Sequence, residues 1–208
     1  MSKKIKLLTT VVFFGSIWGL LEATIGHVLH FIPATIAGSI MFPIAAFILY
    51  KTYKKTDSKA ALFYVGLVAA MIKSVDLLLP SLSIYKTINP MISILLESLV
   101  VVAVITLVIS KKPQLSYTAL PIASIAWRSI FIGYMGIQFA VTGNLAPYIK
   151  TLQAGVNFVI IGGLLSGALA SLLIFLDRHY IHKLNSITIR PVYATLLFIA
   201  ALITTYTL

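Results

Sequence analysis

Long apolar runs make up most of the chain, and short polar stretches separate them. A helix that crosses a hydrocarbon core of about 30 Å needs roughly 17–25 mostly apolar residues. Seven runs have about this length, at residues 7–31, 34–50, 60–79, 91–110, 118–142, 152–176 and 192–208. Prolines, glycines, asparagines and lysines lie between them, as is typical of helix ends. The pattern predicts an all-α, polytopic membrane bundle that forms a single domain over residues 1–208.

Two of these segments differ from the rest. The second is short and contains Pro43, which favours a bend or a tilt. The seventh carries several threonines, so it either crosses the membrane or lies along the interface. The sequence therefore predicts six transmembrane helices plus a seventh at the C-terminus. Strands are not expected, because an unpaired strand leaves its backbone groups unsatisfied in lipid.

The composition indicates the same class of protein. Of the 208 residues, 60% are hydrophobic and 10% are charged, with a mean hydropathy of +1.03, whereas soluble domains carry about 25% charged residues. A soluble core of this size cannot bury so much apolar surface. This excludes a soluble enzyme, a disordered chain and a nucleic-acid-binding domain, despite a pI of 9.9. The lack of cysteine excludes disulfides, thiolate metal sites and cysteine nucleophiles.

Lysines and arginines are distributed unevenly between the two sides of the predicted bundle. If the N-terminus is cytoplasmic, 12 of them fall on the cytoplasmic side and two, Lys86 and Lys150, on the other. The 12 are Lys3, Lys4, Lys6, Lys51, Lys54, Lys55, Lys59, Lys111, Lys112, Arg178, Lys183 and Arg190. This bias predicts a cell-membrane protein with a cytoplasmic N-terminus. The net charge of +11 then indicates contact with anionic lipid, and no nucleic acid partner is needed.

The first segment also has features of a signal peptide, since three lysines precede its apolar run. However, the run is long, and no small-x-small cleavage pattern follows Leu21. We therefore expect an uncleaved helix.

Five ionisable side chains fall inside the predicted helices: Glu22, Lys73, Asp76, Glu97 and Arg128. A charge at mid-bilayer costs at least ~2.5–3.5 kcal/mol, so each needs a partner or a wet cavity. In the predicted orientation all but Arg128, which is near the middle, lie in the outer half. The uncharged polar residues His27, His30, Gln138, Gln153 and Asn157 follow the same trend. We expect a polar cavity that opens outward above apolar packing. The alternative is a set of buried pairs that only hold helices together.

The predicted binding residues are Glu22, Asp76, Glu97, Arg128 and Asn157, with Lys73 balancing Asp76 and with His27 and His30 near the outer end. Lys73 and Asp76 are three residues apart and can share a helix face. Glu22 continues a stripe of glycines, which turns it toward a neighbouring helix. Within the helices, three acids against two bases favour a cationic or zwitterionic solute.

Small residues form stripes on two segments: Gly15 and Gly19 on the first, Gly163 and Gly167 on the sixth. Such stripes let helix backbones approach closely in lipid. They indicate either packing within the bundle or a docking face for a partner membrane protein, reached from the cytoplasmic side.

The chain lacks a His-Glu-x-x-His helix, a nucleophile elbow, a phosphate loop and a dinucleotide fingerprint. We therefore expect no enzyme activity and no cofactor. A metal site built from His27, His30 and either Asp76 or Glu97 is an alternative with little support. Active solute movement would draw on an ion gradient or on another protein.

Together these features resemble the substrate-binding S components of energy-coupling-factor transporters. Three stretches carry the local likeness: GSIWGLLEATIG at 15–26, Met41-Phe42-Pro43-Ile44, and Asn89-Pro90 leading to Glu97. The resemblance spans the first six segments. It implies capture of a vitamin, a vitamin precursor or a metal ion, and docking through small residues onto a transmembrane coupling protein that carries two ATPases. Members of that family usually have six helices, so the predicted seventh is a departure. Their ligand residues vary, so no specific ligand carries over.

The sequence therefore predicts a membrane-embedded solute-binding subunit of an importer. The main alternative is a self-standing cation- or proton-coupled transporter or channel, with Glu22, Asp76 and Glu97 as the relay. An intramembrane enzyme that uses His27 and His30, and a purely structural or assembly role, are the remaining readings.

Overall fold

The computed structural model describes residues 2–29, 34–80, 82–109, 111–112, 115–180 and 188–208. Across these ranges the regular structure is helical, without strands, which confirms the all-α prediction. The long helices are α1 (Lys3–Leu21), α3 (Ala34–Thr56), α4 (Lys59–Lys73), α5 (Ile84–Val104), α6 (Ser116–Thr142), α8 (Gly162–Tyr180) and α9 (Pro191–Thr207).

Shorter helical pieces extend these helices. Three are π-helical: η1 (Glu22–Gly26), η3 (Ile105–Ile109) and η6 (Asn157–Ile161). Two are 3₁₀-helical: η2 (Ser74–Leu78) after α4, and η5 (Pro147–Ile149). The short helix α2 (His27–Leu29) follows η1, and α7 (Leu152–Val156) precedes η6. The widened π turns interrupt the regular advance of side chains around a helix, and such turns are frequent at functional sites.

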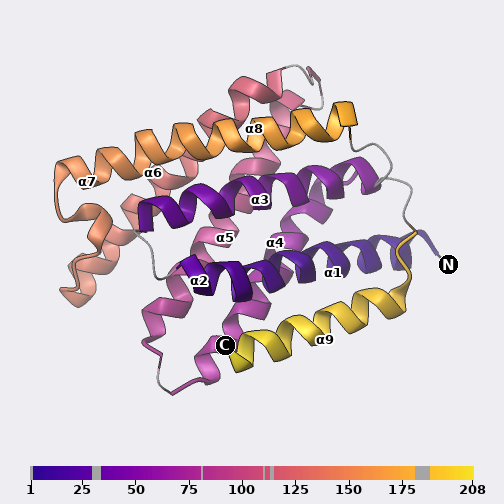
Figure 1. Ribbon diagram of the computed structural model, residues 1–208, viewed down its shortest axis with the longest axis horizontal. Helices are drawn as coiled ribbons and strands as arrows, with labels where there is room; N and C mark the ends of the chain where they lie inside the picture. Colours follow the sequence, from indigo (N-terminus) through magenta and orange to yellow (C-terminus); the bar gives the residue numbers. More distant parts are fainter. Residues whose placement is uncertain (1, 30–33, 81, 110, 113–114, 181–187) are drawn as a thin grey trace.

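The long helices run in alternate directions along the longest axis of the molecule (Figure 1). We call the end where α1 begins the proximal end and the opposite end the distal end. The helices α3 and α8 finish at the proximal end, where α9 starts, and the C-terminus lies toward the distal end. The N-terminal parts of α3 and α5 and the C-terminal part of α1 therefore share the distal half.

The last helix, α9, packs lengthwise against α1 (Figure 1). Its buried residues Ala194, Ala201 and Thr205 recur at helical spacing, while Leu196 and Ile203 on other faces stay exposed. Small side chains on the buried stripe let the two helices lie close together. The seventh segment is therefore an integral helix of the bundle rather than a peripheral one.

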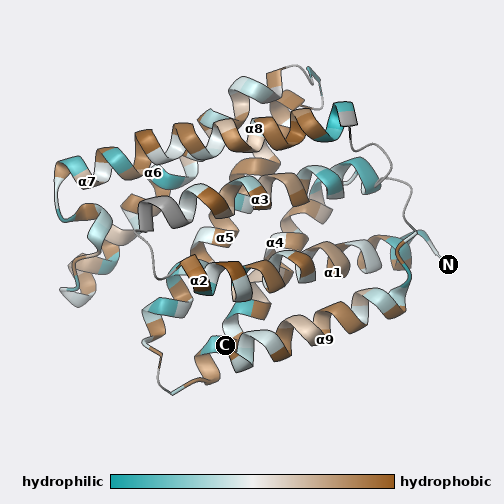
Figure 2. Cartoon of the chain, in the orientation of Figure 1, coloured by the Kyte–Doolittle hydropathy of each residue, from teal (hydrophilic) through white to brown (hydrophobic). Residues whose placement is uncertain are grey.

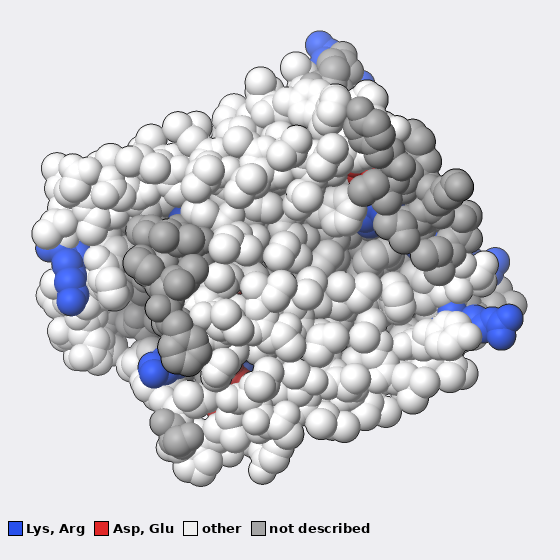
Figure 3. Space-filling model, in the orientation of Figure 1, with Lys and Arg blue, Asp and Glu red and all other residues white. Residues whose placement is uncertain are grey.

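Within the described residues, five helices are long and apolar enough to cross a membrane: Lys3–Leu29, Lys59–Leu78, Ile84–Ile109, Tyr117–Thr142 and Leu152–His179. The helix α9 is apolar but shorter, and α3 is not among the five. Large apolar side chains are exposed around the bundle, such as Leu107 and Ile137 at 67% each. Figure 2 shows hydrophobic residues along most of the helices, and the face in Figure 3 carries its lysines and arginines mainly toward the two ends. The protein is a multi-pass membrane protein.

Two helices continue further than the apolar pattern predicts. The helix α3 extends past residue 50 to Thr56, and α8 extends past residue 176 to Tyr180. Both extensions stay helical because their polar residues face each other: Lys51 Nζ lies 2.8 Å from Asp177 Oδ1, with both side chains buried. Pro43 lies inside α3, so it does not end this helix.

Local chemistry fixes several helix ends. Ser58 and Thr151 lie before α4 and α7, and their side-chain oxygens accept hydrogen bonds from the backbone N–H of Ala61 and Ala154. Gly143 ends α6 in the left-handed conformation, with φ of 72°, where glycine has no steric penalty.

Candidate ligand-binding cavity

The distal half of the bundle contains a partly open cavity of about 200 Å³. Six parts of the chain contribute its wall: η1 with α2, the beginning of α3, the first two-thirds of α5, the end of α4, the middle of α6, and η5 with η6. The lining residues are Glu22, Gly26, Leu29, Gly38, Met41, Lys73, Asn89, Pro90, Ser93, Glu97, Trp127, Phe131, Tyr148 and Phe158.

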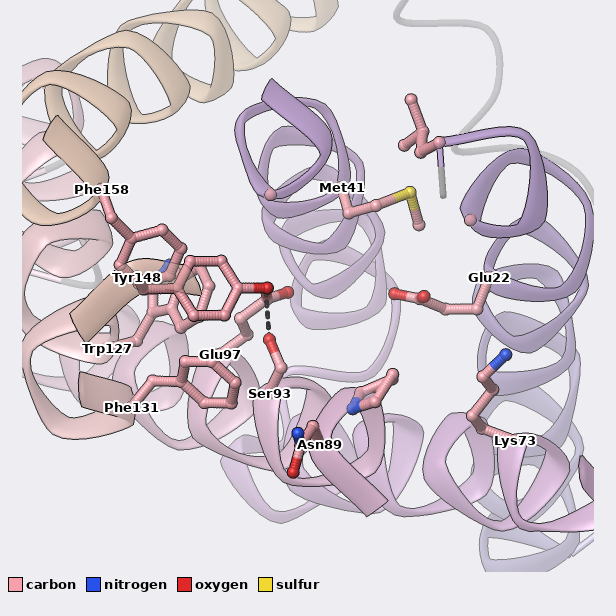
Figure 4. Close-up of a pocket in the computed structure, with 14 residues that line it drawn as sticks. Glu22, Met41, Lys73, Asn89, Ser93, Glu97, Trp127, Phe131, Tyr148 and Phe158 are labelled. Atoms are coloured by element: carbon pink, nitrogen blue, oxygen red, sulfur yellow. Dashed lines mark hydrogen bonds between the residues drawn. The ribbon is translucent and has the colours of Figure 1, made fainter. Parts of the chain in front are cut away.

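Two carboxylates face each other across this cavity. Figure 4 shows Glu22 and Glu97 extending from opposite sides into the same space. Glu22 Oε1 accepts a hydrogen bond of 3.3 Å from the indole nitrogen of Trp18, and Glu97 Oε1 accepts one of 3.2 Å from Ser93 Oγ. Glu97 Oε2 is buried and has no hydrogen-bond partner among the described residues.

Neither carboxylate has a cationic partner within 4.0 Å in the described part of the chain. The residues are nevertheless 9% and 3% exposed. A buried carboxylate without a counter-charge is costly when ionised. These two groups are therefore available to a positively charged or hydrogen-bond-donating guest.

The cation on the cavity wall, Lys73, is already paired. Its amine lies 2.7 Å from Asp76 Oδ2, as the spacing of three residues predicts. Asp76 is in η2 and does not line the cavity. The salt bridge of Lys73 is therefore made to Asp76 and not to either carboxyl group of the cavity wall.

Four aromatic residues form the side of the cavity opposite Glu22 (Figure 4). Tyr148 and Phe158 have ring centroids 4.5 Å apart, and Phe131 lies 6.1–6.2 Å from both. Trp127 meets Phe158 edge to face at 6.1 Å. We call Trp127, Phe131, Tyr148 and Phe158 the aromatic wall. Burial raises the pKa of the Tyr148 phenol above 10, although Arg128 acts in the opposite direction, so Tyr148 presents a neutral hydroxyl at pH 7.

Arg128 lies behind the aromatic wall rather than on the cavity surface. Its residue is fully buried, with its guanidinium carbon 5.0 Å from the Trp127 ring centroid and 4.7 Å from that of Phe158. The guanidinium donates to the backbone carbonyl of Phe158 at 3.0 Å, and makes longer contacts with the hydroxyls of Ser39 and Ser166. It thereby ties the π-helical turn η6 to α6 and holds two of the aromatic rings.

A separate polar cluster lies beside the cavity at the start of α5. Asn89 Oδ1 accepts hydrogen bonds from Tyr134 Oη at 3.0 Å and from Gln138 Nε2 at 3.1 Å. These contacts join α5 to α6 and orient Asn89 on the cavity wall.

The remaining predicted site residues lie elsewhere. Asn157 accepts a hydrogen bond from Gln153 and is not on the cavity wall, and His27 is exposed. His30 is outside the described residues. Within those residues, no group of three or more His, Asp or Glu side chains could hold a metal ion.

The four glycines predicted to form a docking face are buried in contacts inside the bundle instead. A Cβ on Gly15 or Gly19 would come within 2.6–2.7 Å of Val68 or Ile72 of α4. A Cβ on Gly163 would lie 2.7 Å from Ile125 of α6, and one on Gly167 would overlap Pro121. The stripes are therefore used by the α1–α4 and α6–α8 contacts, and these glycines are not free for a partner in this structure.

The sequence did not single out the aromatic wall, because tryptophan, phenylalanine and tyrosine in an apolar segment look like ordinary core residues. It also did not identify the buried Lys51–Asp177 pair, because both residues lie just beyond the apolar runs. The apolar packing expected below the cavity is therefore interrupted by this buried ion pair.

Comparisons of the chain with protein-family models, with curated proteins and with solved structures found no match. The class that the fold and cavity define is a multi-pass helical membrane protein with an acidic and aromatic cavity.

Proposed function

We propose that this protein captures a small solute in the distal cavity and acts as the binding subunit of a membrane importer. One observation carries the proposal: a cavity of about 200 Å³ is bordered by two buried carboxylates that have no ion-pair partner in the described residues. Polar and ionisable groups inside a membrane domain are rare, and they mark substrate or ion pathways.

The uneven lysines and arginines support the direction of capture. Of the 14 that lie outside the predicted segments, 12 belong to the N-terminal side, which favours a cytoplasmic proximal end. The distal cavity then faces the outer half of the cell membrane, and the solute is taken from outside.

The source of energy would be a separate protein. The chain has no nucleotide-binding motif. The resemblance to S components supports a transmembrane coupling protein with two ATPases as the partner, and a vitamin, vitamin precursor or metal ion as the class of solute. The glycine stripes do not contribute to this argument, because they are used in internal contacts.

The experiment is to purify the protein in mild detergent and to search for a retained small molecule by native mass spectrometry. Addition of a solute that binds raises the unfolding temperature with its concentration. A panel of vitamins, vitamin precursors and divalent metal ions is therefore tested by thermal unfolding. Glu97→Gln should abolish retention and stabilisation, while Ser129→Ala, on an exposed position of the same helix as Trp127, should preserve both. No retained molecule and no stabilisation by any member would contradict the proposal.

A self-standing cation- or proton-coupled transporter is the second candidate, because unpaired buried carboxylates are also found in proton and ion relays. Uptake into liposomes distinguishes the two functions. The importer subunit binds its solute but accumulates none without ATPases, whereas the transporter drives uptake alone when a proton or sodium gradient is imposed.

A further inference from the structure

We infer that the solute is a small organic cation, held between the Glu22 and Glu97 carboxylates and the rings of Phe131 and Tyr148. This inference rests on the proposed function, and it narrows the class of solute. It depends on three observations: the acidic groups on the wall, the faces of the rings, and the apolar part of the wall together with the small volume.

The first observation concerns charge. Lys73 is paired with Asp76 at 2.7 Å, and Arg128 is not among the residues that line the cavity, its guanidinium packing against the rings of Trp127 and Phe158. Glu22 and Glu97 therefore remain as the acidic groups of the wall that form no ion pair with a described residue. Glu97 Oε2, which is buried and lacks a hydrogen-bond partner in the described structure, leaves a place for a donor. No free cation on this wall is left to bind the carboxylate of a zwitterion or of an anion.

The second observation concerns the aromatic wall. A cation above the face of an aromatic ring is attracted by the ring quadrupole. Arg128 already lies over Trp127 and Phe158 from outside the cavity. Phe131 and Tyr148 make no such contact with Arg128, and both line the cavity, so they are the rings available to a guest.

The third observation argues against a bare metal ion. Hard cations such as Ca²⁺ take six or more oxygen ligands at short distances. The described wall has only two carboxyl groups, no third acidic or histidine ligand lies with them, and Asn89 Oδ1 already accepts two hydrogen bonds. Leu29, Met41 and Pro90 add an apolar surface. An apolar surface suits the carbon skeleton of an organic cation. The volume of about 200 Å³ is below the roughly 300–1,000 Å³ of sites for drug-sized ligands, which indicates a small molecule.

The test uses three cations, each beside a neutral compound of similar shape: choline with 3,3-dimethylbutan-1-ol, N-methylpyridinium with toluene, and benzylammonium with benzyl alcohol. Binding to the purified protein is measured by calorimetry. We expect at least one cation to bind about tenfold or more tightly than its neutral partner, since charge-assisted contacts are roughly twice as strong as neutral ones. Equal or tighter binding of the neutral compounds overturns the inference.

Variants separate the carboxylates from the rings. Glu97→Gln and Glu22→Gln should each weaken cation binding about tenfold or more and weaken binding of the neutral partner much less. Tyr148→Leu should weaken cation binding several-fold, whereas Tyr148→Phe, which keeps a ring, should not. Each variant is used only if its unfolding temperature without probe stays close to that of the wild type. Unchanged cation binding in both glutamine variants overturns the inference.

The inference and the proposed function fail differently. If none of the six compounds binds, the molecule retained by the purified protein decides: a cation supports the inference, and a neutral or anionic molecule overturns it while the binding function stands. If nothing is retained and neither panel binds, both are overturned.

Discussion

The two ends of the bundle differ in whether their buried ionisable side chains form an ion pair. At the proximal end, Lys51 and Asp177 lie 2.8 Å apart, with side chains only 7% and 4% exposed, and join α3 to α8. At the distal end, Glu22 and Glu97 are just as buried but have no cationic partner in the described residues, and they border a cavity. The Lys51–Asp177 pair is satisfied within the fold. The carboxyl groups of Glu22 and Glu97 are the groups that the proposed solute would bind.

The volume of a hollow alone does not identify the candidate binding site. A second hollow of about 380 Å³ lies between α1, α3 and α8, and its wall is apolar apart from Lys51 and Lys55. No carboxylate of the described residues lines it, and Lys51 is engaged with Asp177. The smaller distal cavity is the better candidate site because its polar groups converge and remain unpaired.

The largest expected effect on stability is that of a substitution in the Lys51–Asp177 pair. Lys51→Met leaves Asp177 buried without its partner, so it should lower the free energy of unfolding by about 3–5 kcal/mol. The double variant Lys51→Met with Asp177→Leu should recover most of that loss, because no charge is left buried. Thermal unfolding in detergent measures both. If the double variant is no more stable than Lys51→Met, the loss of stability is not caused by the unpaired charge of Asp177.

The contact between α6 and α8 should come next, since it joins the proximal half to the turn that carries Phe158. Gly167→Leu places a side chain where Pro121 already lies, and overpacking of this kind costs about 1–3 kcal/mol. Gly136→Leu is the matched control, because a Cβ at Gly136 meets nothing within 4 Å. Equal unfolding temperatures for the two variants would rule out a tight contact at Gly167.

A smaller loss of stability is expected in the polar cluster of the distal half, where Asn89 has two hydrogen-bond donors. Tyr134→Phe removes one hydrogen bond to Asn89, for a loss of about 0.5–1.5 kcal/mol, and Gln138 still donates to the same oxygen. Tyr193→Phe, at a tyrosine that is 55% exposed, should change the unfolding temperature very little. The comparison between the two tyrosines checks whether the cluster stabilises the α5–α6 contact.

The smallest effect on stability is expected at the distal carboxylates, which makes them the sharpest contrast with the proximal pair. Glu97→Gln breaks no ion pair in the described structure, so the unfolding temperature of the ligand-free protein should stay constant or rise slightly. A clear fall would mean that Glu97 has a structural partner, and the contrast between the two ends would be lost. Solute binding, measured on the same sample, should still be abolished.

Much of the fold was predictable because apolar length and charge bias report directly on a helix in lipid. The seven segments, the all-α class and the Lys73–Asp76 pair follow from spacing along single helices. Parts of the candidate site were also predictable: Glu22 and Glu97 are costly in an apolar helix wherever it packs, and both line the cavity.

Other parts of the site depend on contacts between helices. The sequence predicted Arg128 as a binding residue because it is a charged residue inside an apolar helix. In the packed bundle Arg128 instead lies against the rings of Trp127 and Phe158 and does not line the cavity. The glycine stripes allowed either internal packing or a docking face, and the positions of Val68 and Pro121 decided for packing.

The sequence alone determined that this chain forms membrane helices and that a few of its carboxylates need an explanation, because hydropathy and the cost of a buried charge act on each segment separately. The tertiary structure decided which of those charges find partners, since Lys51 meets Asp177 across 126 residues while Glu22 and Glu97 meet across an open volume. Pairing depends on distances between helices, and no periodicity within one helix encodes them.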